Sequence, residues 1–109
     1  MIKLIQHPEL FELQEIENAV MIAYVDWSKY AVGNCTECTH FLREQNYSGE
    51  IIQLYLDNAT QEFQKRTFKE LCQGWGEIFV VVDGQITDSY FGKDCLTNFK
   101  IKYLEDIVR

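Results

Sequence analysis

The sequence lacks several features that would place it in a broad class at once. Its 109 residues contain no apolar run near the roughly 18 residues that cross a membrane. The opening segment, residues 1–6, gives way to His7-Pro8-Glu9 too early for the apolar core of a secretory signal. We therefore expect a cytoplasmic protein. Internal repeats and low-complexity segments are also missing, so the length predicts a single domain over residues 1–109.

Basic residues are scarce as well. Ten Lys and Arg stand against 17 Asp and Glu, which gives a formal net charge of −7 at pH 7. Nucleic acids and anionic membranes bind basic surfaces, so neither is an expected partner. Apolar residues make up 47% of the chain, which is ordinary for a soluble globular protein with one core. We expect a monomer.

What the chain does contain is an alternation of short apolar runs and amphipathic segments. Apolar runs are typical of buried strands, and patterns with helical spacing predict helices between them. Asp83-Gly84 is a strong hairpin signal and adds an antiparallel edge. The pattern predicts an α/β fold with a central mixed sheet of about five strands flanked by about four helices. The expected strands are residues 1–6, 19–25, 50–57, 78–82 and 85–91, and the expected helices are 8–18, 35–45, 59–73 and 95–108.

The segment Cys35-Thr36-Glu37-Cys38 carries the chemistry that these elements would position. If a helix begins at about Cys35, its free N–H groups and dipole favour a thiolate there and lower the thiol pKa. Cys38 lies almost one turn further on and should be more sheltered. An exposed thiol that attacks and a sheltered thiol that resolves the mixed disulfide are what dithiol–disulfide exchange requires. We predict Cys35 and Cys38 as the catalytic pair.

The chain resembles the thioredoxin family in four features. These are the order of elements, Trp27 after the second strand, the Cys-x-x-Cys pair and the hairpin at Asp83-Gly84. The resemblance covers nearly the whole chain and implies a thioredoxin fold. It also implies a thiol–disulfide oxidoreductase that needs no bound cofactor. The substrate would be a disulfide-containing protein or small molecule. A reductase of the thioredoxin-reductase type would recycle the pair.

The chain departs from that family in three places. Residues 28–34 lengthen the connection between Trp27 and Cys35, which we read as part of a polar loop over residues 26–34. The family's cis-proline falls in Trp75-Gly76-Glu77, but Pro8 is the only proline. A cis bond at a non-proline residue costs about 2.5–4 kcal/mol, so we expect a trans Gly76–Glu77 bond and an altered substrate-binding surface at Trp75, Gly76 and Glu77.

The third departure concerns the family's buried acid, which falls on Val25. Asp26 is one residue off and should point to the opposite face of the strand. A carboxylate from Glu77 could replace it. Glu37 and Glu77, if close, would oppose the effect of the helix terminus on the Cys35 thiolate. We therefore expect a modestly acidified thiol and a fairly reducing pair.

Two other functions fit the same residues. One is a non-catalytic interaction module of the same fold. The other is a metal site in which His40 and Cys72 join Cys35 and Cys38, which have zinc-ligand spacing. Against the metal site, we expect Cys72 in the core and His40 on the surface. Cys95 should be an exposed residue at the start of the last helix, incidental or regulatory.

Overall fold

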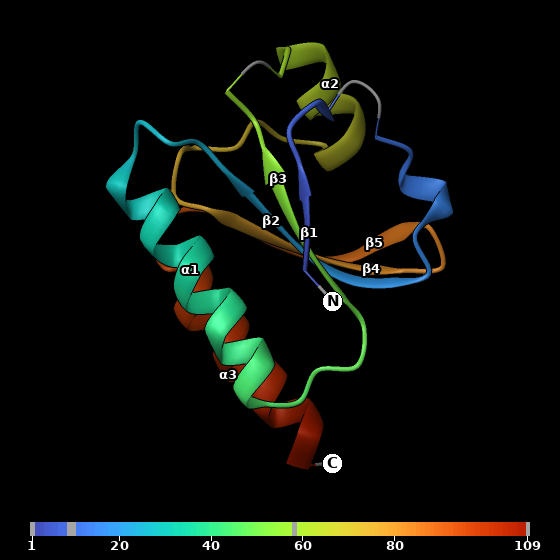
Figure 1. Ribbon diagram of the computed structural model, residues 1–109, viewed down its shortest axis with the longest axis vertical. Coiled ribbons are helices and arrows are strands. Elements are labelled where there is room, and N and C mark those ends of the chain that lie inside the picture. Colours follow the sequence, from blue (N-terminus) through green and yellow to red (C-terminus); the bar gives the residue numbers. More distant parts are fainter. Residues whose placement is uncertain (1, 9–10, 58, 109) are drawn as a thin grey trace.

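The computed structural model describes residues 2–8, 11–57 and 59–108. Within them the chain forms a five-stranded sheet in the order β1-β3-β2-β4-β5, with parallel pairing from β1 through β2 and antiparallel pairing from β2 through β5 (Figure 1). The elements are β1 (Ile2–Ile5), the 3₁₀ turn η2 (Leu13–Glu15), β2 (Asn18–Tyr24), α1 (Lys29–Glu44), β3 (Glu50–Tyr55), α2 (Gln61–Phe68), β4 (Glu77–Val82), β5 (Gln85–Tyr90) and α3 (Cys95–Val108). No helix in these ranges is both long and apolar enough to span a membrane.

The central strand β2 divides the core into two layers because successive side chains of a strand point to opposite faces. Its residues Ala19, Met21 and Ala23 pack with α2 on one face, and Val20 and Ile22 pack with α1 and α3 on the other. Figure 1 shows α1 and α3 side by side on one face and α2 at the opposite side of the sheet. The predicted mixed sheet with covered faces is confirmed.

The described residues contain three α-helices, α1, α2 and α3, where the sequence predicted about four helices. In the range 8–18 the described residues form no α-helix: Pro8 and η2 (Leu13–Glu15) take a 3₁₀ conformation and Asn18 begins β2, while residues 9 and 10 lie outside the described residues. The helix expected over 59–73 is shorter: α2 is capped by the Thr60 hydroxyl and ends where Lys69 takes a left-handed φ of 70°. Asn58 precedes the expected helix and is a residue type favoured as a helix cap, but it lies outside the described residues.

The last helix begins at Cys95 as predicted, and its first half packs on the sheet. Leu96 and Phe99 are buried against the sheet, whereas Leu104 is 44% exposed. The lower half of α3 runs past the end of the sheet beside α1, so that part of the helix has no strand beneath it (Figure 1). The amphipathic pattern of residues 95–108 would also place Ile107 and Val108 on the inner face, but their side chains lie outside the described residues.

The largest difference from the sequence-based expectation is the start of α1. The helix begins at Lys29 and not near Cys35, so most of the segment read as a loop is helical. Ser28 caps it, because its hydroxyl accepts a hydrogen bond from the N–H of Ala31. Gly33 and Asn34 are poor helix formers, yet both lie in the second turn of this helix.

Candidate functional site at the start of helix α1

The helix start determines where the two thiols of the Cys-x-x-Cys pair lie. Cys35 is six residues beyond Lys29, past the first turn, where the helix dipole and the free N–H groups no longer act on it. It is 5% exposed, and Cys38 is fully buried. Both side chains pack in the core between α1, α3 and the sheet. The expectation of an exposed Cys35 at a helix N-terminus is wrong.

Burial sets the acidity of these thiols. Desolvation raises the pKa of Cys35 to about 11, against a smaller lowering effect of the Thr39 hydroxyl. Desolvation also raises the pKa of Cys38, and the neighbouring Cys35 and Cys95 add to that shift. The expected acidified thiol is therefore replaced by one that is protonated at neutral pH. Glu37 and Glu77 are not among the causes of the Cys35 shift.

Ser28 and Ala31 occupy the start of α1, where the helix dipole and free N–H groups would lower the pKa of a thiol. The Ser28 hydroxyl donates to the carbonyl of Gly74 at 2.8 Å, and the Asn34 amide donates to the carbonyl of Trp75 at 2.7 Å. These bonds hold the 73–76 loop against the first two turns of the helix. Figure 1 shows the connection between α2 and β4 descending beside the start of α1.

Glu77 holds the same loop from below. Its side chain is fully buried and its carboxylate accepts three backbone N–H groups, those of Gln73, Trp75 and Gly92. Its charge helps to raise the pKa of the Cys95 and Cys72 thiols, and it is not a cause of the raised pKa of Cys35. Glu77 was predicted as a surface residue that contacts substrate. The structure instead makes it a residue that positions the loop, because no partner can reach it.

The backbone at Gly76 differs from the cis-proline turn that the resemblance to thioredoxins would imply. The described residues contain no cis peptide bond, so the predicted trans Gly76–Glu77 bond is confirmed. Gly76 has a φ of 77°, and a Cβ there would lie 2.9 Å from the carbonyl oxygen of Ala31. Only glycine combines this left-handed conformation with so close an approach to α1.

Three aromatic side chains surround this contact and remain open to solvent. Trp27 is 71% exposed and Tyr30 is 55% exposed, while Trp75 is partly buried. The rings of Tyr30 and Trp75 are 5.1 Å apart, and the Trp27 ring lies next to Gly74. We call Trp27, Tyr30 and Trp75 the aromatic face. Of the predicted substrate-binding residues, only Trp75 belongs to it.

The remaining cysteines and histidine do not complete a metal site. Cys95 is fully buried, not exposed as expected, and its thiol lies 3.6 Å and 3.7 Å from the carbonyl oxygens of Trp75 and Gly76. Cys72 packs against the α2 side of the core, as predicted, and His40 pairs on the surface with Glu44. Among the described residues no group of three or more His, Cys, Asp or Glu side chains could hold a metal ion.

The carboxylate expected to face away from the core does so. Asp26 is exposed and accepts a hydrogen bond from the Tyr55 hydroxyl at 3.0 Å. Val25, at the position of the family's buried acid, packs against the α2 side of the core. The only fully buried carboxylate in the described chain is Glu77, on β4.

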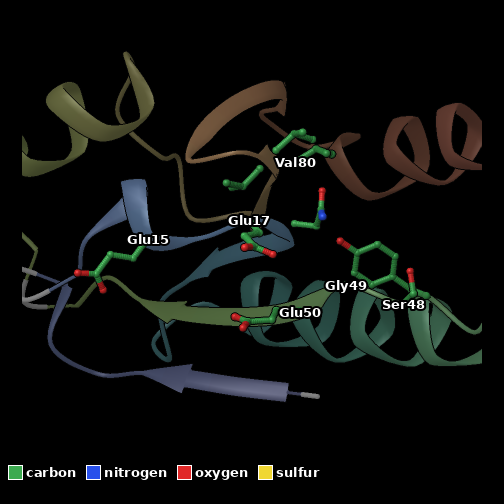
Figure 2. Close-up of a pocket in the computed structure, with 10 residues that line it drawn as sticks. Glu15, Glu17, Ser48, Gly49, Glu50 and Val80 are labelled. Carbon is green, nitrogen blue, oxygen red and sulfur yellow. The ribbon is translucent and has the colours of Figure 1, made fainter.

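The surface also has a hollow away from the aromatic face. It has a volume of about 760 Å³ and runs between the start of β2, the start of β3 and the end of β4. Glu15, Glu17 and Glu50 carry carboxylates on its walls, as Figure 2 shows. All three residues are exposed to solvent.

Sequence reasoning missed the residues that occupy the start of α1, namely Ser28, Tyr30, Ala31 and Asn34. One signal was present: serine directly after the end of a strand is a preferred N-cap residue. Reading Ser28 as the cap would have placed Cys35 in the second turn. The contact of Asn34 with the 73–76 loop joins residues 41 positions apart and left no local pattern.

Comparison with known structures confirms the fold. Thioredoxin f2 of Chlamydomonas reinhardtii superposes with a TM-score of 0.69 at 11% identity, covering 100% of this chain and 97% of that one. Thioredoxin O2 of Arabidopsis thaliana, in its oxidized state, gives 0.70 at 8% identity, with 94% and 92% covered. A putative oxidoreductase with a thioredoxin fold gives 0.66 at 12% identity, with 92% and 91% covered. No family model and no curated protein sequence matches the chain. The protein has the thioredoxin fold.

Proposed function

We propose that this protein is a thioredoxin-fold binding module that recognises a protein partner through its aromatic face, without thiol exchange. The observation that carries the proposal is the start of α1 at Lys29, capped by Ser28. This start leaves no thiol at the helix terminus and puts Cys35 and Cys38 into the core. A thiolate is the nucleophile in disulfide exchange, and the buried Cys35 thiol is protonated at neutral pH.

The aromatic face supplies what a binding module needs. Tryptophan and tyrosine provide large contact areas with a polar tip and are enriched at interfaces. Trp27 and Tyr30 are more than half exposed around a loop that hydrogen bonds hold in place. The net charge of −7 favours a protein partner over a nucleic acid or an anionic membrane. We propose that the module works as a monomer in the cytoplasm.

A disulfide-reduction assay tests this function. The native protein and Cys35→Ser should leave the reduction of insulin by dithiothreitol unaccelerated. The variant Ser28→Cys/Ala31→Cys places a dithiol at the helix terminus, where the thiol pKa is lowered, and should gain activity. The single variant Ser28→Cys avoids adding volume at Ala31, which is fully buried, and should show a faster-reacting thiol than Cys35.

A second candidate keeps the function inferred from the motif. Cys35 and Cys38 are three residues apart on the same face of α1 and pack in one cluster, which favours a dithiol–disulfide oxidoreductase with Cys35 as the nucleophile and Cys38 as the resolving thiol. If the native protein accelerates insulin reduction and Cys35→Ser abolishes the effect, this candidate replaces the first. Cys38→Ser should then trap substrates as mixed disulfides.

A further inference from the structure

The aromatic face offers hydrogen-bond donors rather than free carbonyl groups. The indole N–H of Trp27 and the hydroxyl of Tyr30 project from residues that are 71% and 55% exposed, and the Lys29 ammonium lies 5.4 Å from the Tyr30 ring. The carbonyls of Gly74, Trp75 and Gly76 already accept bonds within the chain. A ligand that suits this face therefore presents hydrogen-bond acceptors to it. The same ligand should carry few N–H groups, because the face has few free acceptors for them.

The 73–76 loop is poorly suited to bind an extended segment by backbone pairing. Strand addition pairs the N–H and C=O of one residue with the partner backbone. In Trp75 the N–H donates to Glu77 and the C=O accepts from Asn34. A partner strand would have to break both bonds, one of them to a buried carboxylate.

A groove shares Trp27 with the aromatic face and has one carboxylate, that of Asp57, on its lining. It has a volume of about 340 Å³ and is lined by Trp27, Gly74 and Asp57 together with apolar residues that include Ala23 and Leu56. Asp26, bonded to the Tyr55 hydroxyl, carries a further negative charge on this side, and Asp57 acts on the same hydroxyl. The groove thus has apolar and aromatic side chains on its lining and acidic groups close to it.

We propose that the ligand of the aromatic face is a proline-rich segment in polyproline II conformation that carries a basic residue at one end. Proline has no N–H, and the polyproline II backbone has no internal hydrogen bonds, so its carbonyls can accept from Trp27 and Tyr30. Proline-rich segments dock on aromatic grooves in other domains. The basic side chain meets Asp26 and Asp57. This inference rests on the proposed function and names the partner class of the same surface.

Fluorescence anisotropy with labelled synthetic peptides tests the proposal on the full chain. The probe is a polyproline peptide that ends in arginine. Controls of the same length end in glutamate or replace the prolines with alternating threonine and alanine. We expect saturable binding of the first peptide, at least tenfold weaker binding of the glutamate peptide, and none of the threonine–alanine peptide.

Variants locate the contact. Trp27→Ala should weaken binding at least tenfold, and Trp27→Phe, which keeps a ring but removes the N–H, should weaken it several-fold. Ile101→Ala is the matched control, because Ile101 is 52% exposed on α3, and should leave the affinity unchanged. Tight binding of the threonine–alanine peptide would overturn the proposal in favour of a strand-like partner.

The two proposals fail separately. If no peptide binds and insulin reduction also stays absent, the proline-rich ligand is wrong and the thiol-independent module still stands. If the native protein reduces insulin through Cys35, the proposed function fails whatever the peptides do. Equal loss of binding in Trp27→Ala and Ile101→Ala would show that the contact is not at the aromatic face.

Discussion

Glu77 is a buried carboxylate whose hydrogen bonds all come from the backbone. Its three N–H donors belong to two segments, the 73–76 loop and Gly92 in the turn before α3. Charge-assisted bonds of this kind are stronger than neutral ones. In the thioredoxin family, which the sequence resembles, a cis-proline shapes the corresponding loop. Here Gly76 and the Glu77 carboxylate together hold a trans loop.

Glu77→Gln should destabilise the protein by about 2–3 kcal/mol. The amide keeps the shape of the side chain but loses the charge, and its NH₂ group would face a backbone N–H that then lacks an acceptor. Urea unfolding followed by circular dichroism measures the change. Glu37→Gln is the control, because Glu37 is exposed and pairs only at 3.7 Å with Lys100, and it should shift stability by less than about 0.5 kcal/mol. Equal effects would contradict the role given to Glu77.

Alkylation of native Cys35 should be slow at neutral pH and should accelerate with alkali. Burial raises the pKa of Cys35 to about 11, so its thiolate fraction grows about tenfold per pH unit from pH 8 to pH 10. Iodoacetamide labelling followed by mass spectrometry measures this rate. In guanidinium chloride all four cysteines should react at the rate of free thiols. A native Cys35 that reacts rapidly at pH 7 would show an acidified thiol.

Helix α1 shows why an element can be predicted while its boundary is missed. A helix over residues 35–45 with a sheltered Cys38 was predicted, and Cys38 is buried in the core as expected. Its first six residues carry a glycine and an asparagine, whose low propensity pointed to a loop. Tertiary contacts decide otherwise: the Asn34 amide bonds the Trp75 carbonyl, and the fully buried Ala31 packs beneath Gly76.

Gly33→Ala should stabilise the protein by about 0.5–1 kcal/mol. Gly33 lies in the second turn of α1, and a Cβ built there meets no atom within 4 Å. Alanine therefore gains helix propensity and reduces the entropy of the unfolded chain without strain. Thermal unfolding of the two proteins checks the sign. Gly76→Ala is the opposite case, since its Cβ would lie 2.9 Å from the Ala31 carbonyl oxygen, and it should destabilise.

The architecture of the whole molecule follows from local patterns to a large extent. Alternating apolar runs and amphipathic segments, with the Asp83-Gly84 turn, predicted a mixed five-stranded sheet, and the sheet is observed. The site was harder to predict because it depends on where a helix begins and on contacts between distant segments. Ser28 meets Gly74 across 46 positions, and Glu77 meets Gly92 across 15. Neither contact has a local signature.

Stability of the whole molecule should fall in alkali. The folded pKa of Cys35 is raised from 9.0 to about 11 and that of Tyr47 from 10.0 to about 12, mainly by desolvation. The folded state thus holds these protons more tightly than the unfolded chain, so the free energy of unfolding is highest below pH 9 and declines as pH rises toward 11. We expect a loss of about 1–3 kcal/mol between pH 8 and pH 11.

Urea titrations at a series of pH values measure that decline. Cys35→Ser serves as the comparison because serine does not titrate in this range, and its stability should fall less steeply with pH than that of the native protein. The slopes are compared rather than the absolute values, since the substitution also changes packing. Parallel slopes would show that the Cys35 thiol is not the group responsible.

The positions of the tryptophans mean that the fluorescence of the protein reports on the aromatic face. The chain contains two tryptophans, and both Trp27 and Trp75 lie on this face. Indole emission from the native protein therefore originates entirely at the proposed docking site. Trp27 is 71% exposed and should emit at long wavelength, while Trp75, packed against the Tyr30 ring, should emit further to the blue. A ligand that covers Trp27 should shift the spectrum to the blue and shield it from iodide quenching, so the unlabelled protein reports its own occupancy.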